Sequence, residues 1–490
     1  MESSVAIPGG QSNLVRGKSV FTGGAAVFLW LLLVSTIGVA LYFMQQRDAI
    51  IAGALLVCIS LAVQIRRNGF EVSGPAALFA LTMAVFVWAR PLIAFTSSNF
   101  NLRLVEVFSG IPVAPEDEAV YFSVLIASML AYGATVLCNQ LPTNLSETTR
   151  HPEGDRPFDP PFLQVWRLLF WTGAAASLIQ SALYVRYFLN GGSYYALYVL
   201  GKDAVDIAGL SLIASFLFYG YLGLLLATDR NAHPALTRRR RLWTTAFVLL
   251  SLFGLTRGSR GEVFTQLLAG LWLLSFTGRK RIGMRVWFFS GVAMFGLAQM
   301  VGGMRSGGDD AFTGSSVSKV LEWFGYTQGI SGELVAVASE KFGVAPANLR
   351  FIFAPLLGPF RRIFDPEFGV QNAHQGMSSG LLSNELAYRV APEYYLAGHG
   401  AGTSYLAETY CALGLLGVLA ATALLTWMVL QGPKLSIRSR SALFFFAATL
   451  PYILFTPRES LVLPVVPALK AVFLLAACKW CQKFLGLLRS

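Results

Sequence analysis

Residues 206–227 read DIAGLSLIASFLFYGYLGLLLA, and Asp206 is the only charged residue in this stretch. A helix needs roughly 20 apolar residues to cross the hydrocarbon core of a bilayer, and this run has that length. Similar runs recur along the 490-residue chain, in which 55% of the residues are hydrophobic and only 13% are charged. Soluble domains carry about 25% charged residues. This composition excludes a soluble enzyme, a disordered chain and a disulfide scaffold, and it predicts a membrane protein.

The apolar runs predict an all-α, polytopic integral membrane protein with about twelve transmembrane helices. The first run follows Arg16 and Lys18, as in a signal peptide, but no small-residue cleavage site comes after it. We therefore interpret it as a retained membrane anchor. The expected spans are residues 25–44, 49–65, 75–97, 119–138, 163–187, 206–227, 242–256, 261–277, 285–302, 402–429, 441–456 and 460–480.

The loops between these spans differ in charge, and the difference predicts their orientation. If the N-terminus is cytoplasmic, every strongly basic loop lies inside, which agrees with the positive-inside rule. These loops include Arg66-Arg67, Arg238 to Arg241, Arg279 to Arg281 and Lys434 to Arg440. The net charge of +12 therefore reflects membrane orientation, and we expect membrane lipids rather than nucleic acid as partners.

The longest connection, residues 303–400, is expected to face outward. Loops longer than about 15 residues are usually functional or disordered, and the aromatic and aliphatic content of this one predicts short helices packed on the membrane surface. We therefore expect three regions. Residues 1–302 hold the spans before the loop, residues 303–400 form the loop, and residues 401–490 hold the last spans and a cytoplasmic tail.

Several arginines fall at the expected outer ends of spans, against the positive-inside tendency: Arg90, Arg257, Arg260, Arg305 and Arg458. Because an arginine near hydrocarbon costs about 2–3 kcal/mol or more, a bound polyanion that offsets this cost is favoured. Arginine makes bidentate contacts with phosphate, and the neighbouring glycines let backbone N–H groups approach it. We interpret the set as a lipid-diphosphate site. Alternatively, each arginine reaches lipid headgroups or pairs with a carboxylate such as Glu262 or Glu459.

A second candidate, GHGAGTSYLAETY at residues 398–410, lies where the large loop re-enters the membrane. Thr403 or Ser404 is expected to cap the next helix, which places Glu408 shallow in the bilayer, where a carboxylate is costly unless paired or functional. His399 can titrate near neutrality. One hypothesis makes His399 or Glu408 a base or substrate ligand. The other is a capped helix start in which Glu408 binds a neighbouring arginine.

Motifs for cofactors and metals are absent from the sequence: it has no Walker A motif, no HExxH, no nucleophile elbow and no paired Cys/His signature. We therefore expect no cofactor and no metal site. The acidic clusters Glu116 to Glu118 and Asp309-Asp310 are interpreted as solvated surfaces.

Four motifs in this order resemble those of the Wzy-type polysaccharide repeat-unit polymerases, the family that includes O-antigen and enterobacterial common antigen polymerases. They are TRGSR at 256–260, GMR at 303–305, GAGTSYLAETY at 400–410 with LGLLG at 413–417, and PRES at 457–460. The resemblance covers roughly residues 206–477. It implies a GT-C-like fold in the bacterial inner membrane, with a large periplasmic loop and the active site facing the periplasm.

The resemblance also implies a reaction. A growing glycan on undecaprenyl diphosphate is transferred, with inversion, to a new lipid-linked repeat unit. The expected catalytic residues are His399, Glu408, Arg257 and Arg260; Arg90, Arg305 and Arg458 bind the diphosphate with them, and Tyr405 and Glu459 contact the sugar acceptor. A chain-length regulator and a flippase are expected partners. The alternatives are an O-antigen ligase that transfers the glycan to lipid A core and a flippase or other transporter of lipid-linked oligosaccharides.

Overall fold

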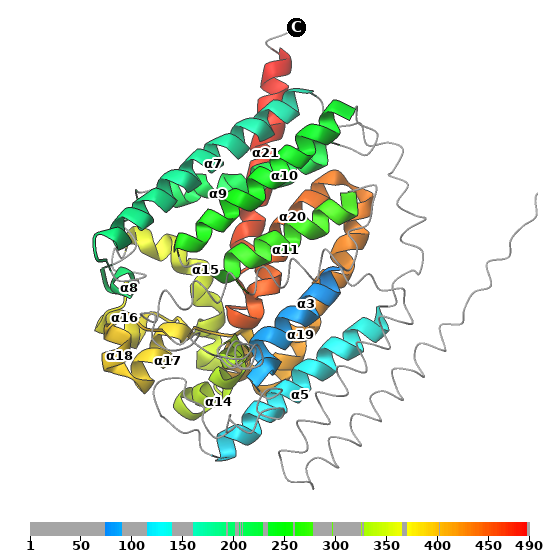
Figure 1. Ribbon diagram of the computed structural model, residues 1–490. Coiled ribbons are helices and arrows are strands. Elements are labelled where there is room, and N and C mark those ends of the chain that lie inside the picture. Colours follow the sequence, from blue (N-terminus) through cyan, green and yellow to red (C-terminus); the bar gives the residue numbers. More distant parts are fainter. Residues whose placement is uncertain are drawn as a thin grey trace, which may run out of the picture.

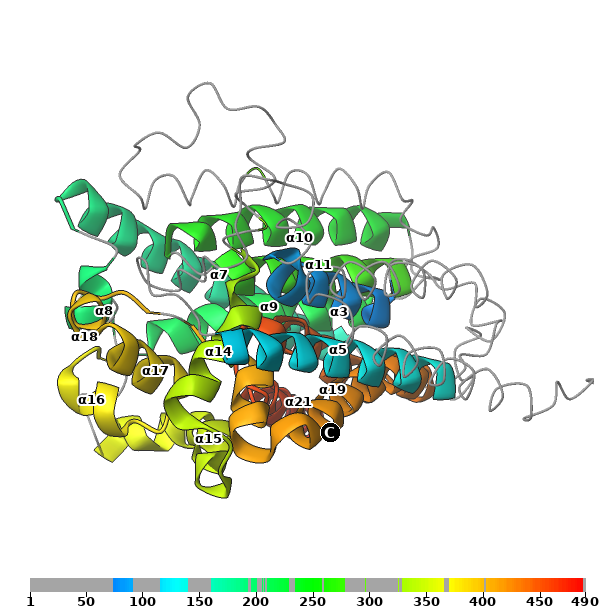
Figure 2. The same cartoon turned by 90° about the horizontal axis from the view of Figure 1, so that it is seen from below.

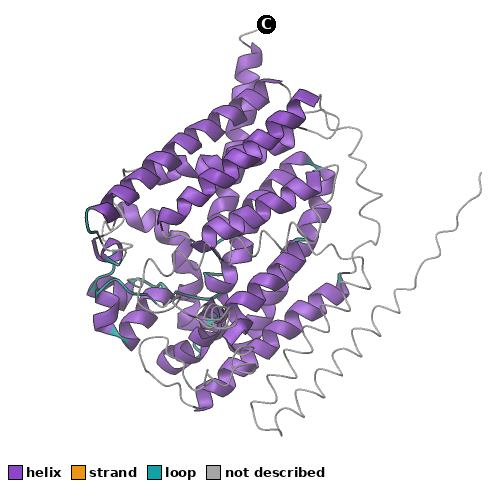
Figure 3. Ribbon diagram, viewed as in Figure 1, coloured by secondary structure: helices purple, strands orange, loops and turns teal. Residues whose placement is uncertain are grey.

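The structure is a computed structural model that describes residues 74–90, 115–139, 160–192, 195–200, 209–228, 234–257, 260–277, 328–364, 370–400 and 402–487, with residues 205, 207, 296 and 325. Every regular element within this part of the chain is a helix (Figure 3). The predicted all-α fold is therefore confirmed.

The long helices follow the apolar runs of the sequence. Proline stands at the first position of several of them, where its missing N–H costs no hydrogen bond. They are α3 (Pro75–Met83) continued by the π-helical turn η1 (Ala84–Trp88), α5 (Pro115–Cys138), α7 (Pro160–Leu189), α9 (Leu210–Ala227), α10 (Pro234–Phe253) with η3 (Gly254–Arg257), α11 (Arg260–Thr277), α19 (Tyr405–Arg438), α20 (Arg440–Phe455) with η5 (Thr456–Arg458), and α21 (Val465–Leu487).

Four helices of the described part are long and apolar enough to cross a membrane: Ala119–Val136, Leu163–Leu189, Leu210–Ala227 and Tyr405–Ser436. Each coincides with an expected span, so the polytopic membrane fold is confirmed. The expected spans 25–44, 49–65 and, apart from one residue, 285–302 lie outside the described residues. The total of about twelve spans stays a prediction.

Small residues allow the closest helix pair, α7 and α9, to pack backbone against backbone. A Cβ on Gly220 of α9 would lie 2.5 Å from the main-chain nitrogen of Phe170 in α7, and a Cβ on Gly173 of α7 would lie 2.1 Å from that of Leu217. Helices in membranes use such small residues because lipid tails provide no hydrophobic drive for association. Trp166 of α7 extends the contact to Phe444 of α20, at 5.0 Å between ring centroids.

In the part of the chain that the structure describes, short helices lie at one end of the long helices and not at the other. In Figures 1 and 2 the segments α14 to α18 gather together at one end, and in Figure 1 the C-terminus lies far from them. A basic side chain marks the end that lacks them: Arg240 Nη1 donates to the carbonyls of Thr228 and Thr277, at 3.4 and 3.3 Å. This contact joins the start of α10 to the ends of α9 and α11.

Residues 303–400 contain short helices, as expected: α14 (Ile330–Phe342), η4 (Pro346–Asn348), α15 (Leu349–Phe364), α16 (Ala373–Ser378), α17 (Leu382–Val390) and α18 (Pro392–Leu396). A further short helix, α8 (Ala196–Leu200), joins them from the connection after α7. α14 does not lie on the surface. It packs against α5 and α19, and Leu334, Ala336 and Ala338 are buried in that contact.

Candidate functional site

The turn that ends α20 is the centre of the site. There η5 places the half-buried Arg458 against two other segments of the chain. Arg458 Nη1 donates to the main-chain oxygen and to Oε1 of Gln328, at 3.4 and 3.3 Å. Its guanidinium carbon lies 5.7 Å from the centroid of the Phe86 ring, within cation–π range. Arg458 therefore links the last part of the chain to η1 and to the start of α14.

The start of α11 lies beside the same turn. A Cβ on Gly261 would come within 2.1 Å of Cε2 of Phe455, so glycine permits this close approach. Phe455 also meets Phe86 edge to face, with 5.9 Å between ring centroids. Because α11 begins at Arg260, the helix start that carries this arginine lies beside the residue that precedes η5. Arg257 ends η3, which packs against the start of α11. Arg305 lies outside the described residues.

Arg90, at the end of the helix that α3 and η1 form, has a carboxylate partner. Its Nη1 makes an ion pair with Oε2 of Glu333 in α14, and both side chains are almost fully buried. The main chain is equally close here, since a Cβ on Gly329 would lie 2.6 Å from the nitrogen of Arg90. Removing one partner of such a buried pair costs about 3–5 kcal/mol, because the other charge is left without compensation. The pair thus fixes α14 against η1.

Glu408 joins the start of α19 to the turn after η5. Ser404 caps the helix by accepting a hydrogen bond from the Leu406 N–H, as expected, and Glu408 follows one turn later with 1% of its surface exposed. Its Oε1 accepts from Thr403 Oγ1 at 3.2 Å, and its Oε2 accepts from Ser460 Oγ and the Leu461 N–H at 2.9 and 3.1 Å. All three donors are neutral, and no arginine whose side chain the structure describes pairs with it.

Two other predicted residues occupy different surroundings. Tyr405 is fully buried, and its hydroxyl lies 2.9 Å from Oγ1 of Thr422 and 3.5 Å from the sulfur of Met83, inside the bundle. Glu459 is half-buried and stands between Arg458 and Ser460. Contacts of Tyr405 and Glu459 with a sugar stay predictions.

His399 lies in a stack of aromatic rings. Its imidazole centroid is 3.8 Å from the ring of Tyr195 and 3.8 Å from the ring of Tyr394. Gln371 supports the same loop by donating from Nε2 to the main-chain oxygen of His399, at 3.3 Å. Burial lowers the pKa of His399 below its ordinary value of 6.5. His399 and Glu408 thus have different partners, although Thr403, which donates to Glu408, lies only four residues after His399.

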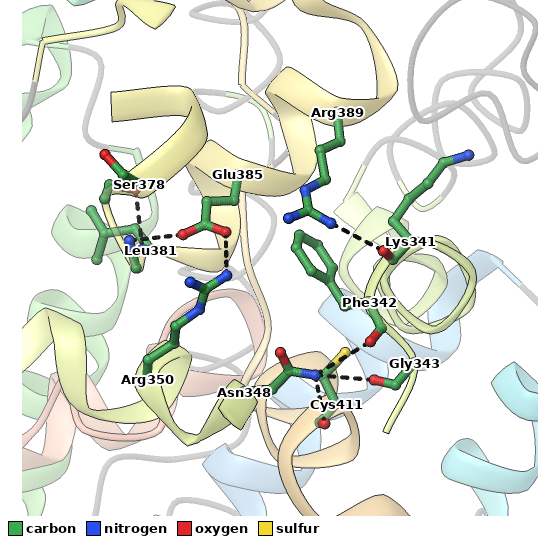
Figure 4. A network of polar contacts seen from close by, with 12 residues as sticks. Lys341, Phe342, Gly343, Asn348, Arg350, Ser378, Leu381, Glu385, Arg389 and Cys411 are labelled. Atoms are coloured by element: carbon green, nitrogen blue, oxygen red, sulfur yellow. Dashed lines mark hydrogen bonds and ion pairs between the residues drawn. The ribbon is translucent and has the colours of Figure 1, made fainter. Parts of the chain in front are cut away.

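A break in α19 separates the part that carries Glu408 from the rest of the helix. Gly414 has φ 64° and ψ −151°, which is not helical and which residues with a side chain rarely adopt. The carbonyl of Cys411, which the break deprives of a helical partner, accepts from the Ala345 N–H at 2.9 Å and from Asn348 Nδ2 at 3.1 Å (Figure 4). The loop after α14 thereby holds residues 405–413 as a separate short helix.

A second buried carboxylate lies beside this break but serves a different purpose. Glu385 of α17 accepts from Arg350 Nη2 at 2.7 Å and from the Gly380 N–H at 2.9 Å (Figure 4). Burial raises the pKa of Glu385 above 4.5, and the nearby Arg350 opposes that shift. Glu385 is therefore a structural carboxylate with a charged partner, in contrast to Glu408.

Gln328, Glu333 and Ser460 are among the residues of the site that were not predicted from the sequence. Glu333 is the one with a usable signal, because it is a single carboxylate in the otherwise uncharged run ISGELVAVA at 330–338. A buried carboxylate of this kind requires a partner. Among the described residues no group of three or more His, Cys, Asp or Glu side chains is placed to hold a metal ion.

The apolar helices and the polar cluster at one of their ends define a polytopic helical membrane protein. The sequence profile of the family O-antigen polysaccharide polymerase Wzy matches residues 26–483, nearly the whole chain. The chain belongs to this family, and its general function is that of a polysaccharide repeat-unit polymerase. The predicted family is thus confirmed over a longer part of the chain than the motifs covered. No curated protein and no solved structure matches the chain.

Proposed function

We propose that this protein is an inverting, GT-C-type glycosyltransferase that transfers the growing glycan from undecaprenyl diphosphate to a new lipid-linked repeat unit. The reaction takes place at the periplasmic side of the bacterial inner membrane. The alternatives are transfer to lipid A core by a ligase and transport of lipid-linked oligosaccharides, and family membership favours polymerisation over both.

The observation that carries this proposal is the meeting of distant segments at one end of the bundle. The turn with Arg458 contacts Phe86 near Arg90 and the helix start that carries Arg260. The same turn reaches Glu408 through Ser460 and Leu461. Permanent positive charge and a carboxylate that pairs with no described cationic side chain are thus held close together, which is an arrangement that suits transfer from a diphosphate.

We assign the arginines to stabilisation of the leaving group. The acceptor hydroxyl oxygen attacks the anomeric carbon of the growing glycan opposite the diphosphate, and the bond between that carbon and the phosphate oxygen breaks. Undecaprenyl diphosphate leaves with the negative charge, which Arg257, Arg260, Arg305 and Arg458 stabilise. Fixed donors of this kind contribute about 2–3 kcal/mol each to transition-state stabilisation. Because Arg90 is paired with Glu333, we assign it a structural role. It holds the start of α14, and with it Gln328, in place against Arg458.

Glu408 is the residue we assign to the proton of the acceptor hydroxyl. No cation among the side chains that the structure describes neutralises its charge, so protonation breaks none of the described ion pairs. Ser460 donates to Glu408, and its hydroxyl can pass a proton from the acceptor to Oε2. His399, in the loop that leads to Thr403, contacts the acceptor and orients it.

The regions of the chain have separate tasks in this proposal. Residues 1–302 and 401–490 form the membrane part, and residues 303–400 form the periplasmic region above the site. The polymer needs a supply of repeat units and a limit on its length. A flippase and a chain-length regulator are therefore the partners we propose.

Purified protein in nanodiscs, given lipid-linked repeat units, tests the proposal. It should lengthen them in the presence of EDTA and without any nucleotide, because the diphosphate is already a good leaving group. Transport without lengthening would contradict the proposal, as would transfer that depends on added lipid A core. The same reaction mixture without the protein provides the baseline.

A further inference from the structure

The stack of Tyr195, His399 and Tyr394 is built into the fold by close backbone packing. Gly398 has φ 95°, and a Cβ at this position would lie 2.1 Å from the main-chain oxygen of Tyr195. The loop before α19 is thereby pressed against the segment before α8, although the two are about 200 residues apart in the sequence. The three rings are therefore held together by the backbone and not only by their own contacts.

Both faces of the imidazole are covered. The Tyr195 and Tyr394 rings are each 3.8 Å from it between centroids, inclined by 32° and 20°. Two rings cannot share one face of an imidazole at this distance, so they occupy opposite faces. Only the edge of His399 is left to contact a ligand. Since burial lowers its pKa, the ring is neutral at neutral pH and offers one donor and one acceptor.

Tyr394, at one end of the stack, is partly exposed. Its exposed fraction is 42%. Beneath the loop, Gln371 is 9% exposed and uses its Nε2 on the carbonyl of His399, while its Oε1 has no hydrogen-bond partner within the described residues. A buried amide oxygen without a partner is unusual in a folded protein. The stack thus combines a partly exposed aromatic ring, an imidazole edge and a buried amide oxygen that accepts no hydrogen bond from the described residues.

This chemistry differs from that of the turn that carries Arg458 (η5 with residues 459–461), which we call the arginine turn. Aromatic rings stack on flat apolar surfaces, and neutral donors and acceptors bind hydroxyl groups, whereas diphosphate requires cations. A sugar ring presents C–H groups on one side and hydroxyls around its edge. We propose that Tyr394, His399 and Gln371 form a subsite for an uncharged sugar ring of the lipid-linked repeat unit. This proposal rests on the proposed function and names the substrate class that this end of the molecule binds.

The chain limits the distance between this subsite and the turn. Thr403, which donates to Glu408, lies four positions after His399, and four residue steps of extended chain span at most about 14 Å. A short oligosaccharide bridges such a distance. One lipid-linked repeat unit can therefore occupy the aromatic subsite while its acceptor hydroxyl lies near Glu408.

Binding of a lipid-free oligosaccharide tests the subsite separately from catalysis. The probe is the repeat-unit oligosaccharide released from the host's own polysaccharide, and the readout is saturation-transfer NMR on the full chain in nanodiscs. Tyr394→Ala should weaken binding about tenfold through loss of the ring contact, while Tyr394→Phe should bind as the wild type does. Phe364→Ala is the matched control. Phe364 is an 85% exposed aromatic residue in the same 303–400 segment and should have no effect.

Kinetics provide the second readout. Tyr394→Ala should raise the KM for the repeat unit about tenfold with kcat nearly unchanged, because a remote contact is made equally in the ground and transition states. Equal binding by wild type and Tyr394→Ala would overturn the subsite, as would displacement of the oligosaccharide by inorganic diphosphate. If oligosaccharide binding depends on Tyr394 but no lengthening occurs, the proposed function fails and the subsite stands. A melting temperature equal to that of Tyr394→Phe shows that the Ala variant is folded.

Discussion

The arginine turn contacts Glu408, which follows His399 of the aromatic stack by nine residues, yet the two regions are built differently. Around Arg458 and Glu408 the groups are charged, half-buried or fully buried, and held by helix ends. Around Tyr394 and His399 the groups are neutral, partly exposed and held by loop backbone. A charged group near a membrane needs preorganised partners, whereas a site that binds a sugar needs an aromatic side chain that is exposed to the ligand. In our proposal, glycosyl transfer takes place at the first region and the second region binds the sugar.

The largest expected effect comes from Glu408. Glu408→Gln should slow lengthening by about 10²–10⁴-fold, the usual contribution of a general base. Binding of the lipid-linked donor should persist. The matched control is Glu385→Gln, which removes another buried, hydrogen-bonded carboxylate and should lower stability without reducing the rate per folded molecule. A Glu408→Gln variant with wild-type rates would remove Glu408 from catalysis.

The next effect is on stability. Glu333→Gln leaves the Arg90 charge buried without its carboxylate, so the free energy of unfolding should fall by about 3–5 kcal/mol. Glu340→Gln breaks the solvent-exposed pair with Lys341 and should cost less than about 1 kcal/mol. Thermal unfolding of both variants in the same detergent measures the difference. Equal melting temperatures would show that the Arg90–Glu333 pair does not anchor α14.

The arginines should give smaller, graded effects on rate. Arg458→Lys keeps the charge but loses the planar fork that binds phosphate and lies over Phe86. We expect kcat/KM to fall about 30- to 150-fold, which corresponds to a loss of about 2–3 kcal/mol. Similar losses are expected for Lys at positions 257, 260 and 305. Initial rates with purified, folded variants give these values, and full activity in all four would leave these arginines only lipid-facing roles.

The smallest effect concerns pH. Because the pKa of His399 is lowered in the folded state, the unfolded chain binds more protons in the window just below pH 6.5. The contribution of His399 to the free energy of unfolding should therefore be fully present above about pH 6.5. It should be lost as pH falls from there through the lowered pKa. His399→Gln should remove this slope. Unfolding midpoints between pH 5 and 8 test it, and identical slopes for wild type and variant would place the imidazole in water rather than in the stack.

Much of the fold follows from the sequence because spanning helices need long apolar runs. The run at 206–227 predicted α9 to within a few residues, and 163–187 predicted α7 equally well. The prediction was less accurate where hydropathy carries no signal. α10 begins at Pro234 rather than 242, because the arginines at its start are good helix formers although they are not apolar. α21 begins at Val465 rather than 460, after a turn that ends at Pro464.

The site was predictable only in part. Charges at the ends of spans stand out against apolar runs and so pointed to Arg458 and Glu408. The structure brings Glu408 into contact with the turn that carries Arg458, and their functional roles stay predictions. Their partners were not predictable, since hydrogen bonds such as that between Ser460 and Glu408 depend on contacts between segments far apart in the chain. The same holds for Tyr195, which meets His399 across about 200 residues. Only tertiary packing brings such residues together.

One cross-linking measurement tests the central claim that the diphosphate binds at the end of the bundle that carries Arg458. An undecaprenyl-diphosphate-linked repeat unit with a photoreactive group next to the diphosphate is bound to the wild-type protein, cross-linked by light and mapped by peptide mass spectrometry. Our account predicts labels in residues 256–261 and 456–461, and their loss in Arg458→Lys. Labels concentrated at residues 228–241 or 431–440, at the opposite end of the long helices, would contradict it.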